Sequence, residues 1–586
     1  MAHLAPFVLL LAAAAAAPAA AAAAPAERLS LAECMARGGV ELIGSDHPGY
    51  DAARRTYNGF SSAWPTGVAL PATAAQAAAA VRCARAAGVP VNPRCGGHGN
   101  EGESVITGHL TLDLQRLAAV RLSRDKQTVR VGGGATMGQL LAGLWRQSNG
   151  TRGFPSGSKF SVGVAGFVLG GGFGSFHRWA GLGADQLIAL TGVTAAGGLI
   201  TANATHHADL LWASRGGGGG KFVVVTEMVL ATMDLSGGTT NFEFAVPHDR
   251  AIETMVWFQA WALGLPNRFI PRSGIEPDPT SPGRVTYFIA GRFFGGEADA
   301  KAALLAAGLE VSSGGLARLS DLTFTYERDI LRSFATENEL GAALAGGADL
   351  LSVMSNRSTF EFEYNWYFKY RSLILDAPLP RDALAIVLDA AQEYPGFHVE
   401  VKFLGGAVAA VPPEASAASH LRRGAIIFIL RGTKVARAPP AAAAGAAGAC
   451  LDAAGAAAAA AAAGAEVRAG SHNATRTIKA VAASLGAPVR SYINFRDSDV
   501  PSFVPDYRAA YYGDNVAALE CLKAKYDPGD LFRQPLDIEP PPGGAPPGCA
   551  PLLARLGAAT AAYSRQLGAR VARGAAAGAG RAGGRR

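Results

Sequence analysis

The 586-residue chain has few charged side chains and no long run of large apolar ones. Asp, Glu, Lys and Arg make up only 17% of the residues while hydrophobic residues make up 49%, so the chain can bury a large core and is not disordered as a whole. No internal stretch supplies the roughly 20 large apolar residues of a membrane-spanning helix, which argues against a polytopic membrane protein. The sequence also lacks a P-loop, a Rossmann G-x-G-x-x-G between strand and helix, and a cysteine spacing typical of zinc, so we expect no metal site.

Acidic residues are missing from the end of the chain. Residues 540–586 contain seven arginines and no Asp, Glu or Lys, so this segment alone carries the formal net charge of +7. The remainder is formally neutral, which argues against a nucleic-acid-binding groove. We expect residues 540–586 to form a basic disordered tail that could contact an acidic polysaccharide.

The first residues have the composition of a secretory signal peptide. An apolar centre at residues 7–11 is followed by small residues that suit cleavage near 22–26, although no Lys or Arg precedes it. Six cysteines and four N-glycosylation sequons fit an oxidising compartment. The sequons are at Asn149, Asn203, Asn356 and Asn473. We therefore predict a secreted glycoprotein with a signal peptide at residues 1–26, with a plain low-complexity alanine tract as the alternative.

The periodicity of apolar residues changes along the chain. Up to residue 235, short strands and helices alternate with Gly-rich loops, and Val225 ends a fully apolar run typical of a buried strand. Beyond residue 235, alternating strands mixed with amphipathic helices predict an antiparallel sheet backed by helices. Residues 439–470 are almost pure Ala and Gly, which indicates an inserted surface loop or a weak helix.

Three Gly-rich turns hold the candidate chemistry. The first, R-C-G-G-H-G-N-E-G at 94–102, follows a strand and places four glycines around His98. Glycine lets backbone N–H groups approach an anion closely, and a dinucleotide pyrophosphate is such an anion. A tight turn with a solvated histidine is the alternative. The second turn spans 161–174, and the third spans 212–220 and runs directly into a strand.

These turns and several other segments resemble the FAD-linked oxidases of the vanillyl-alcohol-oxidase superfamily, and within it the berberine-bridge-enzyme-like family. The first turn resembles that family's R-S-G-G-H motif, with Cys95 in place of the serine. The other matches follow in the family's order between about residue 34 and residue 538. They are 181–185 with G-L-A-A-D, 209–218 with D-L-F-W-A-I-R-G-G-G, 405–422 with a substrate-domain segment, 492–497 with Y-x-N-Y-x-D, and 511–532 with the C-terminal signature.

The resemblance implies an α+β fold in which a PCMH-type FAD-binding domain of two subdomains joins an α+β substrate domain. The implied boundaries are 27–235 for the FAD-binding domain, 236–489 for the substrate domain with its insertion at 439–470, and 490–539 for a segment that returns to the FAD domain. Cys34 and Cys83 match a disulfide of the plant members. Cys521 could pair with Cys549, whereas Cys450 has no obvious partner.

The resemblance also implies FAD as the cofactor, bound covalently through His98, because a neutral imidazole nitrogen is a good nucleophile. Lys159 stands where many members carry a cysteine that makes a second link, so we expect one bond only. Val162 falls at a position that gates oxygen access, where valine is associated with oxidases. The expected FAD-contacting residues are Arg94, Cys95, Gly96, Gly97, His98, Gly99, Gly102, Ser161, Val162, Gly163, Gly166, Val225 and Asn494.

Two pairs of polar residues are candidates for the substrate side. Oxidation of an alcohol needs a base for the hydroxyl proton while flavin N5 takes the hydride. Glu400 and Lys402 are two residues apart and so share a strand face, as do Tyr492 and Asn494. We predict Tyr492 as the proton acceptor, with Lys402 or Glu400 lowering its pKa or taking the proton. A solvated strand face is the alternative reading of Glu400 and Lys402.

Together these features predict a secreted FAD-dependent oxidase of a small-molecule alcohol, either a sugar or an aromatic alcohol, that passes electrons to O2 to give H2O2. Two alternatives remain open. One is a flavin dehydrogenase that uses another acceptor, and the other is an extracellular structural protein on a degenerate flavin fold.

Overall fold

The computed structural model describes residues 29–59, 63–278, 281, 283–327, 331, 347–360, 366–394, 397–431, 435–436, 472–486, 488–502 and 504–583. The predicted signal peptide, the Ala/Gly insertion and Cys450 lie outside these residues. Within the described part, no helix combines the length and the apolar character needed to cross a membrane. The same residues contain no group of three His, Cys, Asp or Glu side chains placed to hold a metal ion.

A four-stranded sheet begins the fold. Its strand order is β1 (Glu41–Ile43), β2 (Gly67–Leu70), β4 (Leu110–Asp113) and β3 (Val91–Arg94), with β2, β4 and β3 parallel. Helix α3 (Ala74–Ala87) begins at the capping side chain of Thr73 and ends at Gly88 in the left-handed conformation. A disulfide between Cys34 and Cys83 joins α1 (Leu31–Arg37) to α3, which confirms that pairing.

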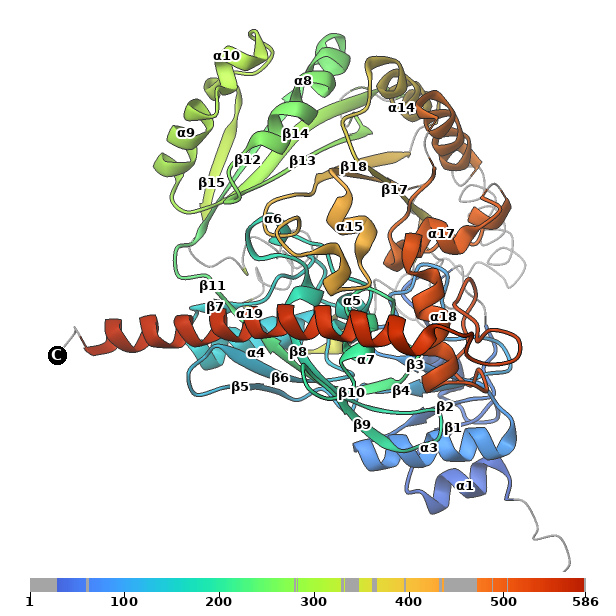
Figure 1. The fold of residues 1–586 in the computed structure, drawn as a ribbon. Helices are drawn as coiled ribbons and strands as arrows, with labels where there is room; N and C mark the ends of the chain where they lie inside the picture. Colours follow the sequence, from blue (N-terminus) through green and yellow to red (C-terminus); the bar gives the residue numbers. More distant parts are fainter. Residues whose placement is uncertain are drawn as a thin grey trace, which may run out of the picture.

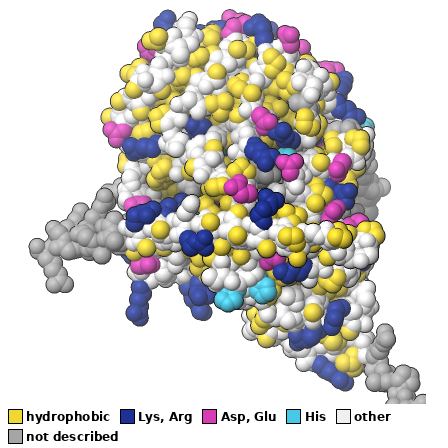
Figure 2. Space-filling view, in the orientation of Figure 1, with side chains coloured by type: hydrophobic (Ala, Val, Ile, Leu, Met, Phe, Trp, Pro, Cys, Tyr) yellow, Lys and Arg dark blue, Asp and Glu magenta, His cyan; other side chains and the backbone are white. Residues whose placement is uncertain are grey.

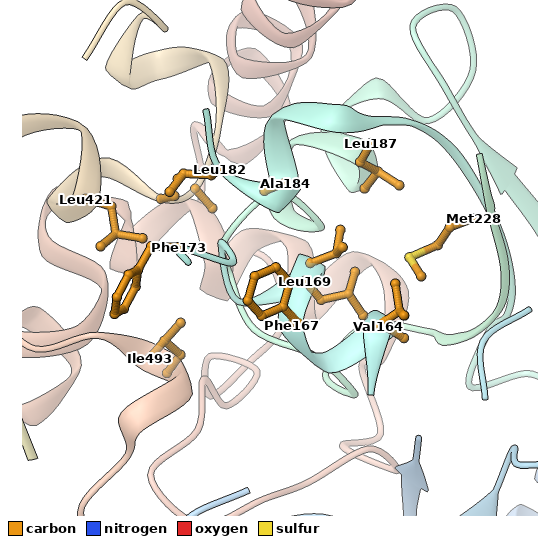
Figure 3. Close-up of a cluster of buried hydrophobic side chains, with 14 of the residues drawn as sticks. Val164, Phe167, Leu169, Phe173, Leu182, Ala184, Leu187, Met228, Leu421 and Ile493 are labelled. Atoms are coloured by element: carbon orange, nitrogen blue, oxygen red, sulfur yellow. The ribbon is translucent and has the colours of Figure 1, made fainter. Parts of the chain in front are cut away.

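A five-stranded antiparallel sheet follows, in the order β5 (Val120–Leu122), β6 (Thr128–Gly132), β10 (Val224–Ala231), β8 (Leu187–Val193) and β9 (Leu199–Ala202). Helices α4 (Met137–Ser148), α5 (Val164–Leu169) and α7 (Ala208–Ala213) belong to the same unit. Figure 3 shows Phe167 and Leu169 of α5 in a buried cluster with Leu187, Met228 and Ile493. Side chains from distant parts of the sequence therefore share one core beside the second glycine-rich turn.

The second half of the chain forms a seven-stranded antiparallel sheet. Its order is β15 (Thr323–Glu327), β12 (Thr239–Val246), β14 (Val285–Phe294), β13 (Phe269–Pro277), β18 (His398–Phe403), β19 (Ile426–Arg431) and β17 (Tyr370–Leu375). Helices α8 (Ala251–Gly264), α9 (Glu297–Ala306) and α14 (Arg381–Glu393) cover one face (Figure 1). This arrangement confirms the predicted α+β class with helices backing an antiparallel sheet.

The segment that follows the seven-stranded sheet packs back onto the first two sheets. It contains α17 (Tyr507–Tyr512) and α18 (Val516–Tyr526). The backbone N–H of Val91 donates to the carbonyl of Leu531 at 2.9 Å, and buried Lys221 forms an ion pair with Asp537. These contacts attach the end of the segment to β3 and to the third glycine-rich turn.

The prediction of a disordered tail is wrong for most of its length, because residues 549–583 form the 35-residue helix α19 (Cys549–Gly583). The helix lies across the outside of the molecule (Figure 1). Its apolar side chains recur at helical spacing and are buried against the body. They are Leu553, Leu556, Tyr563 and Leu567. A disulfide between Cys521 and Cys549 fixes the start of the helix to α18, so the pairing left open by the sequence is present.

Candidate functional site

A cavity of about 1370 Å³ lies between the two N-terminal sheets and the uncovered face of the seven-stranded sheet. All three glycine-rich turns contribute to its wall, and so do β13, β14, β12, β18 and the segment after Ser491. The cavity brings together most of the residues singled out from the sequence. Those that line it are Arg94, Cys95, Gly96, Gly97, His98, Gly99, Val162, Gly163, Gly166, Val225, Glu400, Lys402, Tyr492 and Asn494. Ser161 and Gly102 are not among the lining residues, although Ser161 contacts His98.

The first and second turns touch through their backbones. A Cβ atom on Gly96 would lie 2.3 Å from the backbone nitrogen of Gly163, and one on Gly163 would lie 2.4 Å from that of Gly96. Neither position has room for a side chain, which is the physical reason for glycine at both. Gly166, in the first turn of α5, differs because no atom outside its own helix and chain neighbours lies within 4 Å of a Cβ there. The wall at Gly166 therefore leaves space for a ligand to approach the backbone.

His98 is held on two sides. Its Nε2 atom lies 2.7 Å from Oγ of Ser161, and its ring stacks on Tyr57 with centroids 3.8 Å apart. Burial, followed by the nearby charges of Lys159 and Arg357, lowers the pKa of His98 to about 3. The imidazole is therefore neutral at physiological pH, as a nucleophilic ring nitrogen requires.

Side-chain contacts to neighbouring segments fix Arg94 and Cys95 at the start of the first turn. The Arg94 guanidinium pairs with buried Asp113 at 2.6 Å. The Cys95 thiol donates to the carbonyl of Ala135 at 3.2 Å, and burial raises its pKa, so it stays a thiol. Gly102 has a positive φ of 72° and donates its N–H to the carbonyl of Gly99 at 3.1 Å, which closes the turn.

Three buried polar atoms in the wall have no hydrogen-bond partner among the described residues: Asn100 Nδ2, Glu103 Oε2 and Ser104 Oγ. Buried polar atoms of this kind are usually satisfied, so they indicate a bound polar molecule. FAD carries phosphate and carbonyl acceptors for the amide and hydroxyl, and hydroxyl and amino donors for the carboxylate. The size of the cavity, the open backbone at Gly166 and these three atoms fit FAD.

Tyr492 lies in the wall at 4% exposure, but not on a strand as the alternation suggested. It directly precedes a 3-10 turn (Ile493–Phe495) that brings Asn494 back toward its ring. The Tyr492 hydroxyl oxygen accepts hydrogen bonds from the Gly172 N–H and from Asn494 Nδ2, both at 2.9 Å. Burial raises its pKa to about 12, and these two donors act in the opposite direction.

Glu400 and Lys402 do share one face of β18, and that face lines the cavity, whereas Val399, Val401 and Phe403 enter the core beneath the helices. Lys402 Nζ lies 2.5 Å from Glu400 Oε1. Burial disfavours the Glu400 carboxylate, but Lys402 and Arg272 outweigh it, so the pKa of Glu400 lies below its ordinary value. Burial and the hydrogen-bond donors Gly172 and Asn494 are the main influences on the pKa of Tyr492, and Lys402 pairs with Glu400 instead, so the structure gives no support to the prediction that Lys402 or Glu400 lowers that pKa.

Several lining residues were not found from the sequence. Tyr57 stacks on His98 from an irregular segment that has no periodic pattern. Tyr370 of β17 and Phe495 stack on each other with centroids 5.6 Å apart. Asn100, Glu103 and Ser104 stand in or next to the first turn, where the sequence predicted only Arg94, Cys95, the glycines and His98 as cofactor contacts.

Two family models match the chain. One, described as an FAD binding domain, covers residues 65–203, and the other, described as berberine and berberine like, covers residues 491–539. The chain is 26% identical to chitooligosaccharide oxidase of Gibberella zeae over 88% of its own length and 96% of the relative. It is 27% identical to glucooligosaccharide oxidase of Sarocladium strictum over 88% and 95%.

Solved structures have the same fold. A structure of glucooligosaccharide oxidase from Acremonium strictum, described as containing 6-S-cysteinyl, 8α-N1-histidyl FAD, matches with a TM-score of 0.69 at 25% identity. The match covers 88% of this chain and all of that one. The matched domains include the first two glycine-rich turns and the Tyr492–Asn494 turn that line the cavity. The chain therefore matches an FAD binding domain at 65–203 and a berberine-like segment at 491–539, and over most of its length it is similar in sequence and fold to FAD-linked oxidases of the berberine-bridge-enzyme-like kind.

Proposed function

We propose that this protein is a secreted carbohydrate oxidase that oxidises a hydroxyl-bearing carbon of an oligosaccharide to a carbonyl. The observation that carries the proposal is one cavity that holds the neutral imidazole of His98, the Tyr492 hydroxyl and a polar sheet face. The oligosaccharide oxidases among the relatives support the same substrate class.

Attachment of the cofactor is assigned to His98. With Nε2–H donating to Ser161, the lone pair is on Nδ1, which is then the nitrogen available for a covalent bond. Lys159 lines the cavity two residues before Ser161, and Cys95 is a buried, protonated thiol, so we propose a single covalent link. FAD, when bound, supplies the hydride acceptor and returns the electron pair to O2.

Proton removal is assigned to Tyr492. Two hydrogen-bond donors hold its oxygen in the wall and favour the phenolate, which can accept the proton of a substrate hydroxyl. Because burial raises its pKa to about 12, this form is scarce at neutral pH and grows as the pH rises. Glu400, whose carboxylate is ionised at neutral pH, is the next candidate in the same cavity.

The sheet wall fits a molecule with many hydroxyl groups. Glu243 and Arg272, 3.6 Å apart, and Glu400 and Lys402 form two ion pairs there, and each pair offers both acceptors and donors. The stacked rings of Tyr370 and Phe495 add an aromatic surface of the kind that packs against sugar rings. Paired charges leave no excess of one sign, so a neutral sugar fits better than a strongly charged one.

We also propose that the protein is exported and that its C-terminal helix contacts an extracellular polysaccharide. Two disulfides support an oxidising compartment. Figure 2 shows Lys and Arg side chains on the face that α19 crosses, together with scattered acidic ones. Arg555, Arg565 and Arg573 of this helix are exposed. We propose that they contact an acidic polysaccharide, which retention on a polyuronate column and its loss in Arg→Gln variants would test.

A panel of oligosaccharides and aromatic alcohols, assayed for H2O2, tests the proposed activity. We expect peroxide in stoichiometric amounts with oligosaccharides. Flavin that bleaches with a sugar but recovers only slowly in O2 would instead identify a dehydrogenase. A colourless protein, or a yellow one that no alcohol bleaches, would favour a structural role.

A further inference from the structure

Five charged side chains cluster beside the cavity where three segments meet. Lys369 Nζ lies 3.1 Å from Glu101 Oε1, 3.1 Å from Asp497 Oδ1 and 3.5 Å from Asp499 Oδ1. Arg371 forms ion pairs with the same two aspartates. Lys369, Glu101 and Asp497 are 12%, 18% and 1% exposed at their side chains, so water screens this cluster only weakly.

The three segments carry the two halves of the proposed site. Glu101 follows His98 by three residues in the first glycine-rich turn. Asp497 follows Tyr492 and Asn494 in the turn that places the Tyr492 hydroxyl. Lys369 directly precedes β17 and Arg371 is the second residue of that strand, and Lys369 contacts the segments of both turns.

Hydrogen bonds to β17 hold the segment around Tyr492 in place. Ser372 Oγ accepts from the Tyr492 N–H at 2.8 Å, and the Ile374 N–H donates to the carbonyl of Arg490 at 2.8 Å. Beyond the turn, Lys369 Nζ donates to Ser498 Oγ at 2.7 Å in addition to its ion pairs. The position of Tyr492 therefore depends on how β17 is held.

The first turn is attached to the same point. Asn58 Nδ2 donates to the carbonyl of Asn100 at 2.6 Å and to that of Phe368 at 2.9 Å. Phe368 also packs against Tyr57, the ring that stacks on His98. Lys369 is the next residue, and its ammonium contacts both Glu101 and Asp497.

From these contacts we infer that Lys369 is a positioning residue that fixes the Tyr492–Asn494 turn relative to the His98 turn. The inference rests on the proposed roles of His98 and Tyr492. Without the ammonium, Glu101 loses its ion pair, Asp497 and Asp499 keep their pairing with Arg371, and the charges of Glu101 and Asp497 repel each other. The two turns then lose the one side chain that contacts both Glu101 and Asp497, although neither His98 nor Tyr492 has been changed.

The test compares Lys369→Met, Lys369→Arg and Glu101→Gln in the full-length, FAD-loaded protein. Lys301→Met is the matched control, because Lys301 forms an exposed ion pair with Glu297 on α9. In Lys369→Met we expect hydrogen exchange to speed up about tenfold in both 98–104 and 491–499, and kcat to fall about tenfold with KM unchanged. Lys369→Arg restores most of both. Glu101→Gln speeds exchange in 98–104 only, and adding it to Lys369→Met has no further effect there.

Normal exchange in both segments of Lys369→Met would overturn the inference, as would fully additive effects of Lys369→Met and Glu101→Gln. If Lys369→Met fails to fold, the other two variants still test the inference. Faster exchange must be confined to 98–104 in Glu101→Gln, and exchange in Lys369→Arg must stay close to that of the parent. The exchange measurement does not depend on activity. If Lys369→Met speeds exchange in both segments but the protein oxidises no sugar, the proposed function is rejected and Lys369 is still the positioning residue.

Discussion

His98 Nε2 and Ser161 Oγ lie 2.7 Å apart, so a single hydrogen bond joins the histidine of the first glycine-rich turn to the serine of the second. The bond occupies one ring nitrogen and fixes the plane of the imidazole. Because Gly96 and Gly163 bring the two backbones together beside it, the position of the free nitrogen Nδ1 depends on both turns.

Removing this hydrogen bond should slow the attachment of FAD. A hydrogen bond of this kind is worth about 1 kcal/mol, so Ser161→Ala should lower the rate of covalent flavin incorporation about fivefold. The measurement is the flavin that stays with the protein after acid precipitation, followed over time in apoprotein mixed with FAD. Ser236→Ala, at an exposed position, is the control. An unchanged rate in Ser161→Ala would mean that the bond does not orient His98.

Asn494→Ala should move the pH dependence of flavin reduction. The Asn494 amide donates to the Tyr492 oxygen and so lowers the pKa of the phenol. Without this donor the pKa of Tyr492 rises further, so the phenolate is scarcer at any given pH and the curve of reduction rate against pH moves to higher pH. We expect the reduction rate at pH 7–9 to fall roughly tenfold, the scale of a hydrogen bond to a charged group.

Lys402→Met is the comparison for that experiment. Lys402 pairs with Glu400, so its loss should leave the pH dependence of Tyr492 in place even where KM rises. If Lys402→Met shifts the pH profile and Asn494→Ala does not, the electrostatic account of Tyr492 is wrong.

Val162→Leu should affect only the step with O2. Val162 lines the cavity and its carbonyl accepts from the Met137 N–H at 2.7 Å, so the backbone there is fixed and a larger side chain must take space from the cavity. We expect slower reoxidation in stopped-flow mixing with O2 and an unchanged rate of flavin reduction. Val256→Leu, on an exposed face of α8, serves as the control. Equal reoxidation rates in both variants would remove Val162 as the gate.

Cys549→Ser should destabilise the protein by releasing the start of α19. The Cys521–Cys549 disulfide closes a segment with a sequence separation of 28. The chain-entropy model gives a loss of about 3–4 kcal/mol in the free energy of unfolding. Thermal unfolding should show a lower Tm in Cys549→Ser, the same loss in Cys521→Ser, and no further loss in the double variant. A double variant with twice the effect would mean that the cysteines stabilise the protein separately.

The features that could be predicted from the sequence are those set by local spacing. The alternation of Glu400 and Lys402 placed both on the cavity face of β18, and the glycines around His98 indicated a close backbone approach. The motif order also identified the α+β architecture and the pairing of Cys34 with Cys83. Each of these depends on neighbouring residues or on a match over many positions.

The features that were missed depend on tertiary contacts. The stripe of Leu553, Leu556, Tyr563 and Leu567 is sparse among Ala, Gly and Arg, so composition suggested disorder, although the stripe finds a complementary surface only in the folded protein. Tyr492 and Asn494 have the spacing of a strand, but the turn at Ile493–Phe495 brings them together instead. The link from Glu101 to Asp497 through Lys369 joins residues almost 400 positions apart and leaves no local pattern.

The most direct test of the account is the rate at which an oligosaccharide bleaches the flavin without O2, in the parent and in Tyr492→Phe. Loss of a group that takes a proton in the reaction costs about 10²–10⁴-fold. We therefore predict rapid bleaching of the parent, bleaching slower by that factor in Tyr492→Phe, and the same covalent FAD content in both. Equal bleaching rates in the two proteins would contradict the account and leave Tyr492 as a packing residue. A parent that no oligosaccharide bleaches would contradict the proposed substrate class.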